Sequence, residues 1–369
     1  MLLDQDRPHD QAAPTSHGRR VMESTDVLVL GLGPAGAAAA AAAGRRGCKV
    51  VALDRKHVAG IPVQCAEFVP AMIGIDVVDL ADSVRQPIEA MATYLENDAP
   101  DLRPNFPGYM LDREVFDSAL VSTATQAGAR CRFDSCIRKV TAGGFVELSN
   151  GHTLRARVIV GADGPRSRAG KAIGCVNAEL VETRQISVGL CKPHAATDIF
   201  LSAGIPGGYA WLFPKRDVAN VGAGVNPAHK SRLRQIVACL HASLVREGRV
   251  GREILGLTGG AIPVGGMLKP RGTLGETLVL LAGDAAGLTN PVTGAGIAAA
   301  VHSGRLAGKA AAAAVSGDSV AAQMYEEELE DVYRAALDRA MRRRRELLTT
   351  PPGKAALRRG WIAYAEYWQ

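Results

Sequence analysis

Short apolar runs alternate with alanine-rich stretches along the chain, and the two patterns predict different elements. Apolar runs that end in glycine or aspartate are typical of buried parallel strands, and they occupy residues 26–30, 49–54, 157–163 and 277–283. Stretches dominated by alanine, the strongest helix former, occupy residues 34–46 and 294–315. The first two strands and the helix between them therefore predict a strand–helix–strand unit of an α/β fold.

The other regions predict a second architecture. Residues 112–126 predict a helix with an aspartate N-cap, and alternating runs between 130 and 157 predict a small β-meander. Residues 184–226 are rich in β-forming runs, and a helix is predicted at 229–247. Together these last two segments indicate a separate antiparallel sheet with a covering helix. Residues 319–348 predict a long charged helix.

Composition narrows the possible classes of function. The 369 residues are 47% hydrophobic and 22% charged, so the chain has enough apolar residues for two packed domains. A net charge of only +6 with 5% aromatic residues argues against a nucleic-acid-binding protein. The seven cysteines form no CxxC pair and have no histidine cluster beside them, so we expect reduced thiols and no metal site. No apolar run approaches the roughly 20 residues of a membrane span.

The first candidate site is the sequence GLGPAG at residues 31–36, which follows a predicted strand and opens a predicted helix. The first glycine allows a tight turn, the second lets the backbone approach a pyrophosphate, and the third lets the helix pack on the strand. The helix N-terminus favours negative phosphates. An aspartate at the end of the next strand is placed to accept a hydrogen bond from a ribose hydroxyl. The predicted dinucleotide-binding residues are Gly31, Gly33, Pro34, Ala35, Gly36, Asp54 and Arg55.

A second motif, far along the chain, favours FAD over NAD as the dinucleotide. Gly283 and Asp284 follow a predicted strand, and Asp284 is expected to accept a hydrogen bond from a ribityl hydroxyl. The sequence Gly294-Ala295-Gly296-Ile297 opens a predicted helix. Its backbone amides are expected to meet the pyrimidine edge of the flavin, where the helix dipole favours the negative charge of the reduced form.

With these motifs, the chain resembles FAD-dependent oxidoreductases of the p-hydroxybenzoate-hydroxylase type over about residues 24–316. Residues 112–117 are similar to the DRxxFD segment of that family, which implies that Arg113 contacts FAD. Asp163 and Gly164 are similar to its DG motif, which implies a place beside the pyrophosphate and the nicotinamide route.

Two further segments resemble one branch of that family, the geranylgeranyl reductases. Cys65-Ala66-Glu67 resembles the Cys-Gly-Glu segment of that branch, and GYAWLFP at residues 208–214 matches its YxWxFP pattern. The histidine that aromatic hydroxylases usually carry after GDAA is replaced by Gly287. The chain departs from the branch at Ala66, where glycine is usual, and at Ala295, where glutamate is common.

This resemblance implies reduction of carbon–carbon double bonds in a prenyl chain, by hydride transfer from N5 of the reduced flavin and delivery of a proton to the other carbon. Side chains at positions 209, 211 and 213 alternate along one strand face and predict an apolar cavity wall. The candidate catalytic residues are Cys65, Glu67, Tyr209 and Trp211, with Phe213 and Pro214 as cavity residues. An inert buried cysteine and an ordinary aromatic core are the alternative interpretations of these residues.

The expected partners are an apolar small molecule, a prenyl lipid or an aromatic compound, and a transient reductant. No second GxGxxG unit follows a predicted strand, so NAD(P)H or a small electron carrier would reduce the flavin. Four arginines at 342–345 precede four aromatic residues between 361 and 368. The favoured interpretation is a solvated helix whose arginines are balanced by Glu326 to Glu328 and Glu330, in a cytoplasmic protein. The alternative is peripheral contact of this segment with an anionic membrane.

Two other functions remain open from the sequence alone. One is a flavin monooxygenase or halogenase-like enzyme acting on an aromatic compound or a protein side chain, because halogenases carry a WxWxIP motif with the spacing of residues 209–214. No lysine lies between Lys56 and Lys139, where the lysine of a halogenase is expected, which argues against halogenation but not against hydroxylation. The other is a flavin-binding redox sensor without catalytic activity.

The predicted organisation is a mixed α/β chain in four parts. Residues 1–22 form a disordered tail, and a discontinuous Rossmann-like FAD-binding domain comprises 23–82, 105–180 and 262–318. Residues 83–104 and 181–261 form an inserted antiparallel-sheet substrate domain, and 319–369 form a C-terminal helical segment.

Overall fold

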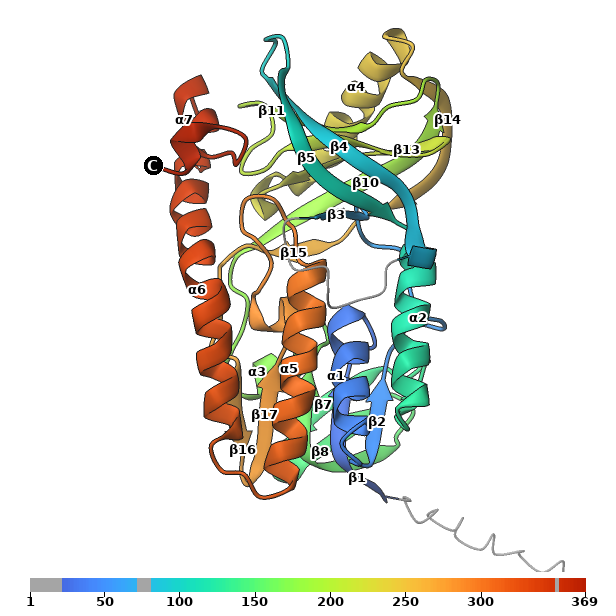
Figure 1. The fold of residues 1–369 in the computed structure, drawn as a ribbon, viewed down its shortest axis with the longest axis vertical. Coiled ribbons are helices and arrows are strands. Elements are labelled where there is room, and N and C mark those ends of the chain that lie inside the picture. Colours follow the sequence, from blue (N-terminus) through green and yellow to red (C-terminus); the bar gives the residue numbers. More distant parts are fainter. Residues whose placement is uncertain (1–21, 72–80, 349–351) are drawn as a thin grey trace, which may run out of the picture.

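The computed structural model describes residues 22–71, 81–348 and 352–369. Within these residues the strands form two sheets, one of eight strands and one of nine. Figure 1 shows the first sheet with its helices in the lower half of the molecule and the second sheet in the upper half. The predicted disordered tail lies outside the described residues, except for Met22, which begins strand β1.

The eight-stranded sheet has the order β16-β17-β9-β1-β2-β6, with β7 and β8 attached at β9. Strands β17, β9, β1, β2 and β6 are parallel to their neighbours in that series, as the apolar runs predict. Their bounds are Met22–Leu30 (β1), Val50–Leu53 (β2), Arg130–Arg132 (β6), Ile137–Thr141 (β7), Phe145–Leu148 (β8), Thr153–Gly161 (β9), Arg271–Leu274 (β16) and Thr277–Leu281 (β17).

Four of these parallel strands end in register. The last residues of β1, β2, β9 and β17 are Leu30, Leu53, Gly161 and Leu281, and they are aligned across the sheet. The loops that carry the predicted cofactor residues therefore begin at one edge of the sheet, the carboxyl edge, which is where open α/β sheets bind ligands.

Helix α1 (Pro34–Gly44) packs closely against α5 (Ile297–Val315) beside the sheet. The contact is close because it uses small side chains: a Cβ atom on Gly304 would lie 2.0 Å from the carbonyl oxygen of Ala35. Helices α2 (Arg113–Gln126) and α3 (Arg168–Ala172) complete this half. Asp112 caps α2 as predicted, accepting hydrogen bonds from the backbone amides of Glu114 and Val115.

The nine-stranded sheet has the order β14-β10-β13-β12-β11-β4-β5-β3, with β15 paired to β10. Helix α4 (Leu233–Arg246) covers it, preceded by a 3-10 turn rather than starting at the predicted residue 229. The strand bounds are Phe68–Pro70 (β3), Val84–Leu95 (β4), Asp101–Leu111 (β5), Leu180–Leu190 (β10), Ala196–Leu201 (β11), Ala210–Lys215 (β12), Val218–Val225 (β13), Val250–Thr258 (β14) and Ala261–Pro263 (β15). Strands β3 and β5 belong to this sheet, although the sequence assigned 68–70 and 105–111 to the FAD-binding domain.

The C-terminal segment differs from the expectation of a basic and aromatic outer surface. It consists of α6 (Ala321–Leu347) and α7 (Lys354–Arg359). Trp361, Tyr364 and Tyr367 are buried, because they pack on the second sheet, and Trp368 is exposed. Glu326 and Glu330 form ion pairs with Arg271 and Arg334, not with the arginines at 342–345. Among the helices that the structure describes, none has the length and apolar character of a membrane span.

Candidate active site

A cavity of about 680 Å³ lies where the two sheets and the C-terminal segment meet. Its wall draws on the N-termini of α1 and α5, on the loop at 64–68, on strands of the nine-stranded sheet, and on α6 and residues 361–368. Predicted site residues that line it are Gly33, Pro34, Ala35, Cys65, Glu67, Arg113, Gly164, Tyr209, Trp211, Phe213, Asp284, Gly294, Ala295, Gly296 and Ile297. Gly31, Gly36, Asp54, Arg55, Asp163, Pro214 and Gly283 lie outside this wall.

The glycine-rich turn has the geometry that a pyrophosphate requires. Gly31 has a φ of 97°, and a Cβ atom on Gly36 would lie 1.8 Å from the carbonyl oxygen of Gly31, so both are needed by the fold itself. A Cβ atom on Gly33 would meet no atom within 4 Å. Helix α1 begins there with no side-chain cap and no acidic residue in its first turn. Free amides facing open space at a helix N-terminus fit an anion such as a pyrophosphate.

The two aspartates beside this turn have different surroundings. Asp54 accepts hydrogen bonds from the backbone amides of Leu32 (2.7 Å) and Lys56 (2.8 Å), which holds its carboxylate at the carboxyl edge. Asp163 accepts hydrogen bonds from Ser167 and from the amide of Arg168 at the start of α3. Burial raises the pKa of Asp163, and these hydrogen bonds counteract part of the shift. Because its carboxylate holds the start of α3, Asp163 acts in the structure as a turn residue, and Gly164 is the member of the DG pair that lines the cavity.

The opposite end of the predicted flavin site is formed by Asp284 and the start of α5. Asp284 is partly buried and accepts a hydrogen bond from the Thr289 hydroxyl at 2.6 Å. Burial raises its pKa, while this hydrogen bond and the charge of Arg113 act in the other direction. Helix α5 starts at Ile297 rather than at the predicted Gly294, and it has no side-chain cap. The Gly294 and Ala295 amides donate to the Asn290 carbonyl and the Thr293 hydroxyl, so it is the start of the helix at Gly296 and Ile297, together with the Asp284 carboxylate, that fits the polar edge and ribityl chain of a flavin.

Arg113 links the start of α2 to the cysteine segment. Its Nε and one terminal nitrogen donate to the two carboxylate oxygens of Asp117, at 2.9 and 3.0 Å. The Cys65 side chain also lies close enough to interact electrostatically with its guanidinium. Burial alone would lower the pKa of Arg113, but Asp117 and Cys65 outweigh that effect and raise it. Arg113 therefore presents a permanent positive charge to the sulfur.

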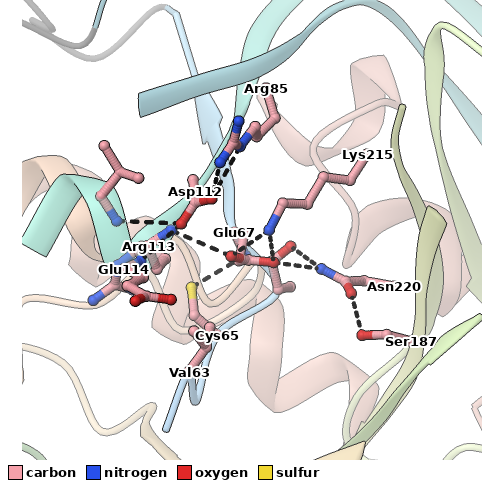
Figure 2. Close-up of polar contacts among 12 residues, drawn as sticks. Val63, Cys65, Glu67, Arg85, Asp112, Arg113, Glu114, Ser187, Lys215 and Asn220 are labelled. Atoms are coloured by element: carbon pink, nitrogen blue, oxygen red, sulfur yellow. Dashed lines mark hydrogen bonds and ion pairs between the residues drawn. The ribbon is translucent and has the colours of Figure 1, made fainter. Parts of the chain in front are cut away.

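Glu67 holds the cysteine segment in place through an ion pair with the second sheet. Figure 2 shows its carboxylate between Lys215 and Asn220. The Lys215 ammonium donates to both oxygens (2.9 and 3.0 Å), Asn220 donates at 3.0 Å, and the Arg113 amide donates at 3.3 Å. Glu67 has a φ of 69°, a left-handed conformation that costs a non-glycine residue roughly 1 kcal/mol or more. This network supports a positioning role for Glu67 instead of the predicted catalytic one.

Cys65 lies at the cavity wall with one hydrogen-bond donor on its sulfur and a cation nearby. The backbone amide of Glu67 donates to Sγ at 3.2 Å, and the Arg113 guanidinium acts on the sulfur as a positive charge. Gln185 on β10 donates to the Cys65 carbonyl (3.2 Å) and accepts from the Trp211 indole (3.0 Å). The aromatic wall and the cysteine segment are therefore tied together by one side chain.

The aromatic wall follows β12 as the alternation predicts. The ring centroids of Tyr209 and Trp211 are 5.7 Å apart, those of Trp211 and Phe213 are 6.1 Å apart, and those of Tyr209 and Trp361 are 4.9 Å apart. Burial raises the pKa of Tyr209, so the phenol stays protonated and donates to the Thr293 carbonyl at 2.6 Å. Pro214 is the predicted cavity residue that the wall does not include.

Lys215, Asn220, Gln185 and Trp361 were not among the predicted site residues. The first three lie on β12, β13 and β10, within the predicted β-rich segment 184–226, and carry no motif. Asn220 lies between apolar residues, and a polar residue at such a position is a signal for a buried polar network. No group of three or more metal-ligating side chains occurs among the described residues.

Replacing Lys215 by methionine is expected to lower the free energy of unfolding by about 3 kcal/mol, because it leaves the Glu67 carboxylate buried without its cation. Denaturant unfolding of the flavin-loaded protein measures this. The double variant Lys215→Met, Glu67→Gln should recover most of the loss, since the buried charge is then absent. A single variant within about 0.5 kcal/mol of wild type would show that the ion pair does not hold the segment.

The comparisons with known proteins agree with this geometry. Residues 181–262 match the family model described as the geranylgeranyl reductase catalytic domain. The chain is 33% identical over 348 residues to digeranylgeranylglycerophospholipid reductase 1 of Methanopyrus kandleri, covering 84% of this chain and 88% of that protein. The crystal structure of a geranylgeranyl bacteriochlorophyll reductase-like protein from Thermoplasma acidophilum matches with a TM-score of 0.79 and 25% identity, covering 94% and 98% of the two chains.

The fold is also found outside the reductases. PqsL from Pseudomonas aeruginosa, described as "a probable FAD-dependent monooxygenase", matches with a TM-score of 0.69 and 19% identity, covering 91% of this chain and 98% of that one. The protein therefore has a fold that is found both in a reductase-like protein and in a protein described as a monooxygenase. The chain is similar to the Methanopyrus reductase over most of both sequences. It therefore belongs to the geranylgeranyl reductase family.

Proposed function

We propose that this protein reduces carbon–carbon double bonds in the isoprenoid chains of a glycerophospholipid. The observation that carries the proposal is the position of Cys65, which shares one cavity with the aromatic wall and with the uncapped N-termini of α1 and α5. Relatives named as digeranylgeranylglycerophospholipid reductases support the substrate class.

The residues that would hold FAD lie in two groups. The turn at 31–36 and Asp54 would hold the pyrophosphate and adenosine half, and Arg113, Asp284 and the amides at 296–297 would hold the flavin half. When bound and reduced, FAD supplies a hydride from N5. A nicotinamide nucleotide or a small electron carrier would reduce it in a transient encounter.

Cys65 supplies the proton that completes the reduction. Its S–H proton goes to the alkene carbon that does not receive the hydride, so one C–H bond forms at each carbon and the sulfur is left as a thiolate. Arg113 and the Glu67 amide stabilise that negative sulfur until water reprotonates it. The rings of Tyr209, Trp211 and Phe213 exclude water from the isoprenoid chain and orient it. Anaerobic mixing of the reduced enzyme with a prenyl lipid tests the proposal, and we expect the flavin to reoxidise without oxygen as the lipid is reduced.

Replacing Trp211 by alanine is expected to lower kcat/KM for a long-chain substrate at least about tenfold while FAD content stays unchanged. The reason is that Trp211 contacts the cavity from β12 and lies outside the dinucleotide-binding sheet. Flavin absorbance and steady-state kinetics with short and long prenyl substrates measure the two effects.

The variant Trp211→Phe keeps an aromatic ring at the position, so it shows whether the effect of alanine comes from a general loss of stability. Phe200→Ala is the matched control, since Phe200 lies in the same sheet and outside the cavity wall. Loss of FAD with an unchanged chain-length preference in Trp211→Ala would show that this residue is ordinary core.

A further inference from the structure

Helix α6 contributes two arginines to the cavity wall, at different depths. Arg344 is only 3% exposed. Arg339, about one and a half turns earlier on the helix, is half-buried, and its guanidinium lies 5.4 Å from the ring centroid of Trp368, an exposed residue at the same cavity. Arg339 therefore lies at the partly exposed rim of the cavity, and Arg344 lies in its interior.

Arg344 is a buried cation whose hydrogen-bond partners among the described residues are uncharged. One terminal nitrogen donates to the carbonyl oxygens of Gly207 (2.9 Å) and Pro291 (3.4 Å), and Nε has no hydrogen-bond partner. Among the described residues no carboxylate lies within ion-pair distance of it. Arg113, a partly buried arginine in the same cavity, differs in this respect because Asp117 neutralises it with two hydrogen bonds.

The charge of Arg344 persists at neutral pH. Burial lowers its pKa to about 10, and Glu179 acts on it only as a more distant negative charge. Leaving a buried cation without an anionic partner costs several kcal/mol. A protein that keeps such a residue in a cavity wall has a place for an anion there.

A second unpaired donor lies close by. Trp361 is 2% exposed, its indole nitrogen has no hydrogen-bond partner, and it lines the same cavity. Its ring contacts Tyr209, and the carbonyl that Arg344 binds belongs to Gly207, two residues earlier in the chain. The two unsatisfied donors therefore flank the same turn at one end of the aromatic wall.

We propose that Arg344 and Trp361 bind the phosphate group of the lipid substrate, with Arg339 at the rim of the same subsite. The inference rests on the proposed function for the identity of the ligand, and on the two unpaired donors for its charge. A guanidinium and an N–H group suit a phosphate, which accepts several charge-assisted hydrogen bonds. With its phosphate held at this end, the isoprenoid chain would lie along the aromatic wall.

Equilibrium binding of ligands to the FAD-loaded enzyme tests the subsite, and quenching of tryptophan fluorescence measures the binding. The ligands are geranylgeranyl phosphate, geranylgeraniol and inorganic phosphate. Wild type should bind the phosphate ester about 10 to 100 times more tightly than the alcohol, the range for charged hydrogen bonds. Inorganic phosphate alone should bind weakly, and tighter binding of the free ion than of the ester would assign the subsite to free phosphate and overturn the lipid assignment.

The variant Arg344→Gln should bring the ester and the alcohol to within about threefold of each other, since the interaction with the charge is removed. Arg345→Gln is the matched control, because Arg345 is exposed in the same arginine run and its loss should leave the preference intact. If Arg344→Gln does not fold, Arg344→Lys should keep part of the preference, and Trp361→Phe, which removes only the N–H donor, should reduce it severalfold.

Two results would overturn the proposal: no preference for the ester in wild type, or an equal loss of preference in Arg344→Gln and Arg345→Gln. Flavin reoxidation on the same samples separates this outcome from failure of the proposed function. Reoxidation by both ligands without a binding preference would contradict the phosphate subsite alone. A preference that depends on Arg344 without any reoxidation would contradict the reductase activity alone.

Discussion

Replacing Cys65 by alanine is expected to slow transfer from reduced flavin to a prenyl substrate by roughly 10²–10⁴, the range for loss of a positioned general acid. FAD content and the rate of flavin reduction should remain close to wild type, because the dinucleotide-binding loops begin at a sheet edge that Cys65 does not form. Stopped-flow absorbance of the flavin, in separate reductive and oxidative half-reactions, measures both rates.

Two controls sharpen this prediction. Cys65→Ser should keep more activity than Cys65→Ala, since a hydroxyl still hydrogen-bonds water in the path of the proton. Cys239→Ala removes an exposed cysteine on α4 and should leave both half-reactions unchanged. If Cys65→Ala reoxidises with substrate as fast as wild type, the proton comes from elsewhere and the assignment of Cys65 is wrong.

Replacing Gly33 by valine is expected to abolish FAD binding in a protein that still folds. The backbone at Gly33 has a φ of −70°, which valine adopts, and a Cβ atom there meets no protein atom within 4 Å. The valine side chain would instead occupy the space that we assign to the pyrophosphate. Flavin absorbance after purification and reconstitution measures the loss, and circular dichroism checks the fold.

Neighbouring glycines provide the contrast. Gly36→Val should fail to fold, because its Cβ would lie 1.8 Å from the Gly31 carbonyl oxygen. Gly189→Val, on a strand of the other sheet with open space around it, should keep FAD. Stoichiometric FAD in Gly33→Val would place the pyrophosphate elsewhere.

The cofactor half of the molecule could be predicted from the sequence because its determinants are local. Consecutive residues specify a buried strand, a glycine turn and a helix N-terminus, as at 26–46. Parallel pairing then brings Gly31, Asp54 and Asp284 to one edge. Helix α5 begins at Ile297, three residues after the predicted start, because residues 294–296 form a turn in which the Gly294 and Ala295 amides donate to the Asn290 carbonyl and the Thr293 hydroxyl.

The substrate half was less predictable because its contacts join distant positions. Glu67 and Lys215 are 148 residues apart, and neither residue type alone distinguishes an ion pair from a solvated charge. Trp361 belongs to a segment whose composition suggested a membrane surface, yet it packs against Tyr209 in the cavity wall. Strands β4 and β5 were not predicted, since their apolar alternation is interrupted by polar residues and prolines.

Because reductases and monooxygenases share this fold, the central question is whether the reduced flavin reacts with the lipid or with oxygen. Wild-type enzyme reduced in the absence of oxygen should be mixed with a digeranylgeranyl glycerophospholipid, with flavin absorbance and lipid mass followed together. Our account predicts that the flavin reoxidises without oxygen and that the lipid gains two hydrogen atoms for each flavin reoxidised. Flavin that reoxidises only after oxygen is admitted, with a hydroxylated product, would contradict it.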